Sequence, residues 1–382
     1  MSHIESTASF AGLGGDPKFG DPSKLPAAPM VSVFMITYQH AAFIREAIDS
    51  VLMQRVDFPY EICIGEDEST DGTREICLEF ARKHPDKIRL FLRNRANPAR
   101  RAFAAPFLFN MASTFDACRG KYIALLEGDD SWLSPLKLQT QVKLLEGNPG
   151  LAASCHYAAC LSEGRPWALS VTPTCPVESF DIEAVLKRDV GNVHTSTWLL
   201  RRGTPVPWHK LVTSPFGEYP IIVCAMLQGT ALALPQVWSL YRSHARAVFT
   251  SRSTETRLEW NVELWKCLES VVPVNLHAAA AIGTSRARNM LTRTLSKAGK
   301  FGPALQCLRS NLSEIARNQF PASERRRLRW RALEALLLPH LQGLRERANR
   351  RRARTVSLPQ ATLSSTADLS LRGLNSPSRL PF

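Results

Sequence analysis

The first half of the chain alternates short, mainly apolar runs with amphipathic stretches. The apolar runs end abruptly in polar or charged residues, which is typical of strands buried in a parallel sheet. The stretches between them carry apolar residues at helical spacing. The predicted strands are Val31 to Ile36, Tyr60 to Gly65, Ile88 to Leu92 and Tyr122 to Leu126, and the predicted helices are 42–52, 74–83, 107–118 and 137–145. This alternation predicts an α/β fold with a mainly parallel, Rossmann-like sheet and helices on both faces.

The pattern becomes irregular after residue 150 and helical after residue 255. The expected elements are a strand at 152–159, a helix at 180–187 opened by Asp181, a strand ending at Leu200, a helix at 221–228, and two short strands at 231–234 and 238–241. Further helices are expected to contain the apolar stripe Leu258, Val262, Trp265 and Leu268, and to cover 284–298, 302–317 and 323–338, with Pro339 ending or kinking the last one. The predicted organisation is a flexible segment at 1–29, an α/β domain at 30–250, a helical region at 251–354 and a disordered tail at 355–382.

Charge and cysteine content exclude few classes of protein. The net charge is +14, but residues 322–354 hold eleven Arg and three Glu, so a net +8 belongs to one segment. The nine cysteines show no paired or metal-binding spacing, which indicates reduced thiols in a cytoplasmic protein. No apolar run has the length of a membrane span, and the N-terminus lacks an apolar signal core.

Polar residues gather at the carboxyl ends of three predicted strands. These clusters are Thr37-Tyr38, Glu66-Asp67 and the segment from Glu127 to Asp130. Ligands of open α/β sheets bind at that edge. Three carboxylates within four residues repel one another, and a divalent cation that prefers oxygen ligands would offset them. The alternative interpretation of the acidic cluster is a solvated turn.

The same blocks resemble a known family. VSVFMITYQH, GEDESTDGT and GKYIALLEGDDSW are similar, in order and spacing, to the start of the family 2 inverting glycosyltransferases with a GT-A fold. NVHTSTWLLRR, FGEYP and YRSHARAVF resemble later blocks of a bacterial subgroup. The resemblance covers roughly residues 30–250, the size of a single domain, and leaves the helical region outside it.

The resemblance implies a role for each matching position. Thr37 and Tyr38 would line a nucleotide-base site, and Asp67, preceded by Glu66, would bind the base, typically through a uracil N–H. Glu127, Asp129 and Asp130 match the segment that holds the metal and the ribose, and Glu218 matches a late carboxylate that acts as general base. Glu66 and Glu127 stand where Asp is common, so Asp129 and Asp130 are the stronger metal and ribose candidates.

The implied reaction moves a sugar from a nucleotide-sugar donor, with UDP-sugars favoured, to a hydroxyl of a saccharide, lipid-linked or surface-polysaccharide acceptor. Mn²⁺ or Mg²⁺ would stabilise the charge on the departing diphosphate. Glu218 would accept the proton of the attacking hydroxyl, and a helix N-terminus would favour its ionised form. One displacement without a covalent intermediate inverts the anomeric configuration.

Each candidate also has a purely structural interpretation. Glu218 would then be an ordinary carboxylate at a helix start, Asp67 a turn residue, and Thr37 and Tyr38 the close of a strand. His244 follows a predicted strand and offers a cation for a diphosphate, whereas His194 is the weaker candidate. Arg100 and Arg101 either reach the nucleotide or belong to a solvated loop, and Trp132 either stacks on a sugar or packs in the core.

Two other classes of function compete. A nucleotidyltransferase would usually carry a Gly-rich basic loop after the first strand, where this chain has Thr37-Tyr38-Gln39-His40. A binding protein could act through the Arg-rich segment 322–354, by reversible contact with anionic membranes at the inner face of the cell membrane. The alternative is a helical cap on the catalytic domain with a solvated Arg face; a cap is the favoured interpretation of 255–317, and membrane contact stays open for 322–354. No interleaved aromatic pattern supports specific nucleic-acid binding.

Overall fold

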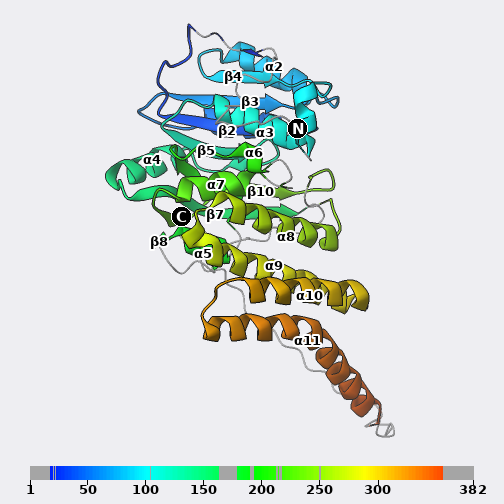
Figure 1. Cartoon of the computed structure of the whole chain (residues 1–382). Helices are drawn as coiled ribbons and strands as arrows, with labels where there is room; N and C mark the ends of the chain where they lie inside the picture. Colours follow the sequence, from blue (N-terminus) through cyan, green and yellow to red (C-terminus); the bar gives the residue numbers. More distant parts are fainter. Residues whose placement is uncertain are drawn as a thin grey trace, which may run out of the picture.

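The computed structural model describes residues 18–355 except 20, 22, 104, 163–178, 190–192, 212–213, 215–216 and 249–250. A twisted sheet occupies one end of the molecule, and a stack of helices extends from it (Figure 1). The predicted tail at 356–382 and residues 1–17 lie outside the described part of the chain.

One ten-stranded sheet runs through the α/β domain, in the order β1-β4-β3-β2-β5-β9-β7-β10-β6, with β8 beside β10. Its strands are β1 (Lys18–Phe19), β2 (Val31–Thr37), β3 (Tyr60–Glu66), β4 (Ile88–Leu92), β5 (Tyr122–Glu127), β6 (Ser131–Trp132), β7 (Leu151–Ser162), β8 (Ser179–Phe180), β9 (Leu199–Arg201) and β10 (Thr230–Ser243). The neighbours β4, β3, β2 and β5 are parallel, and β9 and β6 run antiparallel to their neighbours. The predicted mixed, mainly parallel sheet is therefore confirmed.

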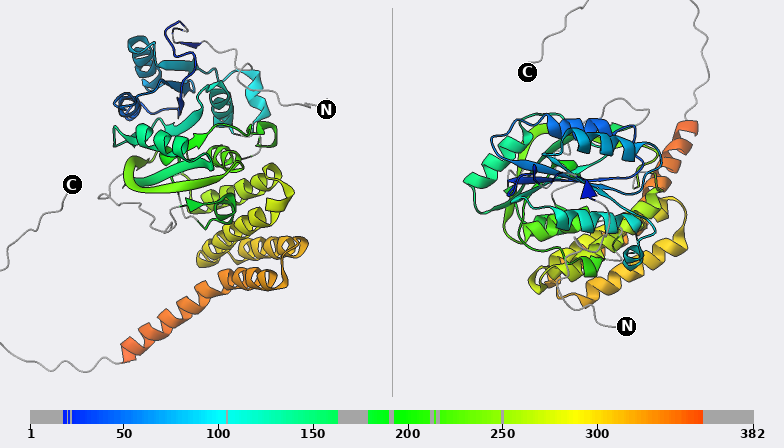
Figure 2. Two further views of the ribbon diagram at one scale, coloured as in Figure 1. Left: turned by 90° about the vertical axis from the view of Figure 1, so that its left-hand side faces the viewer. Right: turned by 90° about the horizontal axis from the view of Figure 1, so that it is seen from above.

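Helices cover both faces of the sheet, as the apolar strands require (Figure 2). On one face, side chains such as Val33 and Ile62 pack with α1 (Ile44–Leu52), α2 (Thr73–Lys83) and α4 (Lys137–Gly147). On the other face, side chains such as Phe34 and Leu125 pack with α3 (Pro106–Ala117) and α7 (Glu218–Met226), and with the first helices of the C-terminal region. Two shorter helices, α5 (Ile182–Lys187) and α6 (Trp208–Leu211), complete the domain, and Asp181 caps α5 as predicted by accepting from the Ala184 N–H at 2.8 Å.

Several boundaries differ from the sequence prediction, among them that of α9 (His277–Lys297), which begins at His277 rather than at residue 284, and those of β10 and α7. The two short strands expected at 231–234 and 238–241 are one strand, β10, whose pairing with β7 shifts register between Leu234 and Val237. Pro235 lies inside that shift. Because proline has no N–H to donate, an irregularity at this position removes few hydrogen bonds between the two strands. Helix α7 begins at Glu218 rather than at Ile221, with Pro220 in its first turn, where a missing N–H is tolerated.

The C-terminal helices stack away from the sheet. They are α8 (Thr254–Val271), α9 (His277–Lys297), α10 (Phe301–Arg317) and α11 (Ala322–Thr355). The expected stripe Leu258, Val262, Trp265 and Leu268 is buried, and α9 contacts α8, α10 and α11. Pro339 lies inside α11, and this helix changes direction part way along its length (Figures 1 and 2), as a proline in a helix interior causes. No helix in the described ranges is both long and apolar enough to cross a bilayer.

A buried ion cluster holds β3 to the start of β5. The fully buried Glu61 accepts from Ser32 Oγ at 2.6 Å, from the Arg119 backbone N–H at 3.0 Å and from Arg119 Nη2 at 2.5 Å. We expect Glu61→Leu to lower the free energy of unfolding by about 3–5 kcal/mol, because it leaves the mostly buried Arg89 guanidinium, as well as Arg119, without its carboxylate partner. Urea unfolding measures this change. The matched control is Glu79→Leu, which removes an exposed pair with Arg45 and should change stability little; equal losses in the two variants would contradict the argument.

Candidate active site

The loops that follow β2, β3 and β5 lie side by side at one edge of the sheet. Thr37 pairs with Glu66 across β2 and β3, and Ile36 pairs with Glu127 across β2 and β5. The ladder continues into the loops, because the Asp67 N–H donates to Thr37 O at 3.1 Å and the Gly128 N–H donates to Ile36 O at 3.0 Å. A Cβ on Gly128 would lie 2.6 Å from Thr37 Oγ1, so only glycine fits there. The three polar clusters of the sequence therefore converge.

Glu66 orders the loop after β3. It is fully buried, its carboxylate accepts from the Ser69 N–H at 2.7 Å, and it forms an ion pair with Arg74 from α2. Asp71 joins this loop to the one after β2 by accepting from the Ala41 N–H at 3.0 Å. The contacts of Glu66 are thus with the protein's own backbone and with Arg74.

Asp67 lies beside two arginines from the segment after β4. Arg100 pairs with one of its carboxylate oxygens, and Arg95 Nη2 lies 3.2 Å from the other. The Arg95 guanidinium also covers the ring of Tyr38, 3.7 Å from the centroid. Arg101 is exposed, since the short 3₁₀ helix Pro98–Ala102 turns neighbouring side chains to different sides. Of the two arginines considered in the sequence, the buried Arg100 is the one that contacts Asp67.

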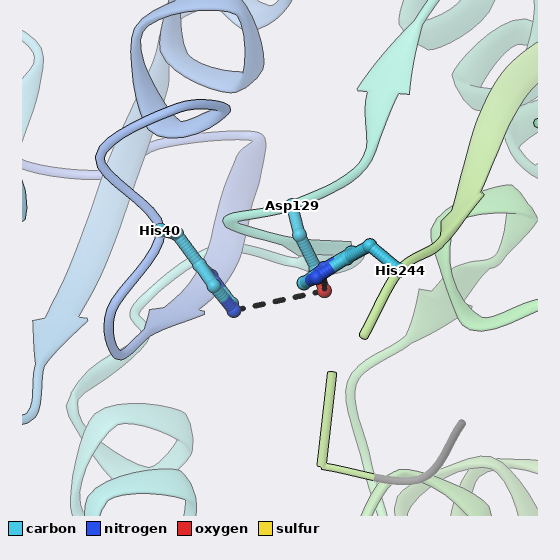
Figure 3. Close-up of side chains that lie close together, drawn as sticks. All are labelled: His40, Asp129 and His244. Carbon is cyan, nitrogen blue, oxygen red and sulfur yellow. Dashed lines mark hydrogen bonds and ion pairs between the residues drawn. The ribbon is translucent and has the colours of Figure 1, made fainter. Parts of the chain in front are cut away.

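Asp129 lies between two histidines (Figure 3). Its Oδ2 is 3.1 Å from His244 Nε2 and 3.6 Å from His40 Nε2. Burial alone would raise the pKa of Asp129, but His40 and His244 hold it below its usual value. Burial lowers the pKa of His40, which favours the neutral imidazole that can ligate a metal. Ligand atoms of these three residues lie within 4.8 Å of one another, close enough to share one ion.

Asp130 is not part of this cluster, and one of its carboxylate oxygens contacts β10. Its Oδ1 accepts from the Arg242 backbone N–H at 3.0 Å, and the Arg242 guanidinium donates to Asp129 O at 2.9 Å. Arg242 also pairs with Glu46 of α1 at 2.5 Å. The antiparallel pairing of β10 with β6 brings these residues together, because Leu240 lies opposite Ser131. Arg242 thus fixes the turn that carries Asp129.

Glu218 meets Glu127 at the same edge, although 91 positions separate them in the chain. Their carboxyl groups share a hydrogen bond. Burial, followed by the charges of Glu218, Asp129 and Asp130, raises the pKa of Glu127 well above its usual value. Burial also raises the pKa of Glu218, against the lowering effect of backbone N–H groups at the start of α7. The contact between the two carboxyl groups raises the pKa of Glu127 and lowers that of Glu218, so it favours a protonated Glu127 beside Glu218.

The start of α7 is placed by close packing. A Cβ on Gly217 would lie 1.9 Å from Met111 Sδ of α3, so any side chain directly before Glu218 would force Met111 to move. This packing brings the first residue of α7 to the carboxyl end of β5.

Trp132 and His194, two other candidates from the sequence, make packing contacts inside the protein. Trp132 is buried and donates from Nε1 to Ser196 O at 2.8 Å, so it packs in the core. His194 stacks on Tyr241 with ring centroids 4.3 Å apart, and burial lowers its pKa to about 4.

Three further residues contribute to the site but were not singled out from the sequence. His40 contacts Asp129, Arg95 contacts Asp67 and Tyr38, and Arg242 contacts the Asp129-Asp130 turn. His40 and Arg242 stand within the quoted blocks VSVFMITYQH and YRSHARAVF, three positions after Thr37 and two before His244. A histidine and an arginine inside these blocks could have marked them as candidates. Their contacts could not be predicted from the sequence, because the contacted residues lie in distant parts of the chain.

Comparison with known proteins agrees with this geometry. Residues 32–204 match the model of glycosyl transferase family 2. An uncharacterized protein of Mycobacterium tuberculosis is 30% identical over 240 residues, which covers 60% of this chain and 63% of that protein. An uncharacterized glycosyltransferase of Nostoc sp. is 28% identical over 240 residues, covering 59% of this chain and 68% of that protein. The chain thus spans just under two thirds of the mycobacterial relative.

The fold is shared with a solved structure. TarS of S. aureus, determined in complex with UDP-GlcNAc, matches with a TM-score of 0.53 and 15% sequence identity, over 82% of this chain and 92% of that chain. The architecture is a GT-A fold. Residues 32–204 form a glycosyl transferase family 2 domain, as the motifs predicted.

Proposed function

We propose that this protein is a metal-dependent, inverting glycosyltransferase that uses a nucleotide-sugar donor, with UDP-sugars favoured. The observation that carries the proposal is the meeting of Asp67, Asp129 and Glu218 at the carboxyl edge of one sheet, from three separate segments. TarS, which shares the fold, binds UDP-GlcNAc, and this supports the class of donor.

The metal site of the proposal consists of Asp129, His244 and His40. One carboxylate and two imidazoles within reach of a single ion form a chemically suitable donor set. Imidazole ligands suit first-row transition ions, whereas Mg²⁺ prefers oxygen alone, so the set favours Mn²⁺ over Mg²⁺. A cation held there would neutralise negative charge on the departing diphosphate. Glu127 and Asp130, the other proposed ligands, have Glu218 and Arg242 as neighbours.

The nucleotide base would bind between Tyr38 and Asp67. Although Arg95 and Arg100 contact both Asp67 oxygens, each carboxylate oxygen has two lone pairs, so an acceptor remains for a base N–H. Arg95 is 39% exposed at its side chain and can leave the Tyr38 ring for a stacked base. Thr37 and Glu66 would then support this site by holding the loops together.

Glu218 is the proposed general base. It stands at a helix start beside the acidic turn, where an acceptor hydroxyl can approach the anomeric carbon from the face opposite the diphosphate. A carboxylate with a raised pKa accepts a proton more readily at neutral pH than an ordinary glutamate. The acceptor would be a saccharide, a lipid-linked sugar or a surface polysaccharide.

A donor panel tests this proposal. We expect UDP to raise the thermal unfolding midpoint in the presence of Mn²⁺, with a smaller rise in Mg²⁺ and little effect of the nucleotide alone, because bound ligands stabilise only the folded state. Thermal shift with UDP, GDP, dTDP and CMP, each with and without metal, identifies the nucleotide. Absence of any metal-dependent shift across the panel would contradict the proposed class.

A further inference from the structure

Helix α11 has two apolar faces. Its inner face, Leu328, Ala332 and Ala335, is buried against α9 and α10. Its outer face consists of Trp330, Leu333 and Leu337, whose exposed fractions are 69%, 39% and 53%. Spacings of three and four residues put these side chains on one side of the helix, about half a turn from the inner face. A helix that needed only to cap the domain would require the inner face alone.

Arginines surround the outer face. Arg326, Arg327, Arg329 and Arg331 are all exposed. Because each residue advances the helix by 100°, Arg329 and Arg331 stand on opposite sides of Trp330. Glu324 pairs with Arg327 at 2.6 Å, and the segment 325–331 contains five Arg and no acidic residue. Glu334 lies on this side of the helix as well, so the outer face is an apolar stripe whose flanks are positive along its N-terminal part.

We propose that the outer face of α11 inserts at the surface of an anionic membrane. An aromatic and two leucines would enter the boundary between headgroups and acyl chains, where tryptophan is favoured. The flanking guanidinium groups would pair with anionic headgroups. The helix is the outermost layer of the stack in Figure 1 and in the left view of Figure 2, so the face is open to a large flat partner. This inference is independent of the proposed sugar transfer.

Two other occupants fit less well. A second copy packed about a two-fold axis at Trp330 would bring Arg329 and Arg331 close to the same arginines, and like charges in close contact repel. A nucleic acid would take the positive charges, but its phosphates leave the apolar stripe without a partner. Only an anionic lipid surface matches both the charge and the apolar stripe.

Co-sedimentation of the full chain with lipid vesicles tests the proposal. We expect pelleting with vesicles of phosphatidylcholine containing phosphatidylglycerol, little pelleting with phosphatidylcholine alone, and weakening by salt. Arg326→Gln, Arg329→Gln and Arg331→Gln together should weaken binding roughly a hundredfold, from about fivefold for each charge. Trp330→Ser, Leu333→Ser and Leu337→Ser together should weaken it more than about tenfold.

Matched controls test whether weaker vesicle binding comes from the outer face of α11 rather than from any loss of exposed apolar side chains or from misfolding. Val274→Ser, Met290→Ser and Leu305→Ser remove three exposed apolar side chains on other helices, and this variant should bind vesicles as the parent does. Thermal unfolding checks that each variant is folded. Equal pelleting with neutral and anionic vesicles would overturn the proposal. Parent-like vesicle binding by the serine variant of the outer face would also overturn it, because the ligand would then recognise charge alone, as a nucleic acid does. A dimer that is seen in sedimentation velocity and that this variant abolishes would overturn it as well, because the face would then be covered by a second copy.

Discussion

Glu218→Gln is expected to lower turnover by roughly 10²–10⁴-fold while leaving donor affinity nearly unchanged. The amide keeps the size of the side chain and can still hydrogen-bond Glu127, but it cannot accept a proton from the acceptor. The proposed metal and nucleotide contacts are Asp129 and Asp67, from other segments of the chain, so donor binding should be spared. Steady-state kinetics measures turnover, and titration calorimetry with UDP and Mn²⁺ measures affinity.

Two further variants make this result specific. Glu218→Asp should retain part of the activity, because it keeps the base but loses reach. Glu183→Gln changes a glutamate in the first turn of another helix, α5, and should behave as the parent. If donor affinity fell as far as turnover in Glu218→Gln, the residue would serve to hold substrate or structure. Full turnover in that variant would mean that the base lies elsewhere.

Asp129→Asn is expected to abolish the metal-dependent part of UDP binding. The amide removes the carboxylate of the proposed site between His40 and His244, and we expect metal affinity to fall by more than about a hundredfold, beyond the loss seen when a supporting residue of a metal site is changed. In the parent, saturating UDP and Mn²⁺ at about a hundred times the Kd should add roughly 2.7 kcal/mol of stability. Thermal unfolding with UDP, with and without Mn²⁺, measures that gain.

Asp130→Asn separates two assignments of the metal. If the ion lies between Asp129 and the two imidazoles, the variant should keep a metal-dependent gain, because Asp130 Oδ1 already accepts from the Arg242 N–H. His244→Gln should reduce the gain strongly, and the exposed Asp57→Asn should leave it unchanged. A full gain in Asp129→Asn together with a lost gain in Asp130→Asn would return the metal to Asp130 alone.

The sequence predicted the parallel half of the sheet well. The strands Val31–Thr37, Tyr60–Glu66, Ile88–Leu92 and Tyr122–Glu127 lie within one residue of their predicted bounds. These strands are buried on both faces, and burial on both faces demands continuous apolar runs that are easy to recognise. The later strands were harder, because β10 is long, irregular and only partly buried, so its apolar pattern breaks near Pro235.

The candidate site was also predictable only in part. The chain by itself determined which loops follow parallel strands, and hence that Thr37, Asp67 and Asp129 share an edge, because the carboxyl ends of parallel strands meet there. Local pattern cannot report contacts between segments that are far apart in the chain. The pairing of β10 with β6 brought His244 and Arg242 to Asp129, and the packing of Gly217 on Met111 brought Glu218 to Glu127. Only the tertiary structure decided these contacts, since they depend on strand pairing and helix packing between distant segments.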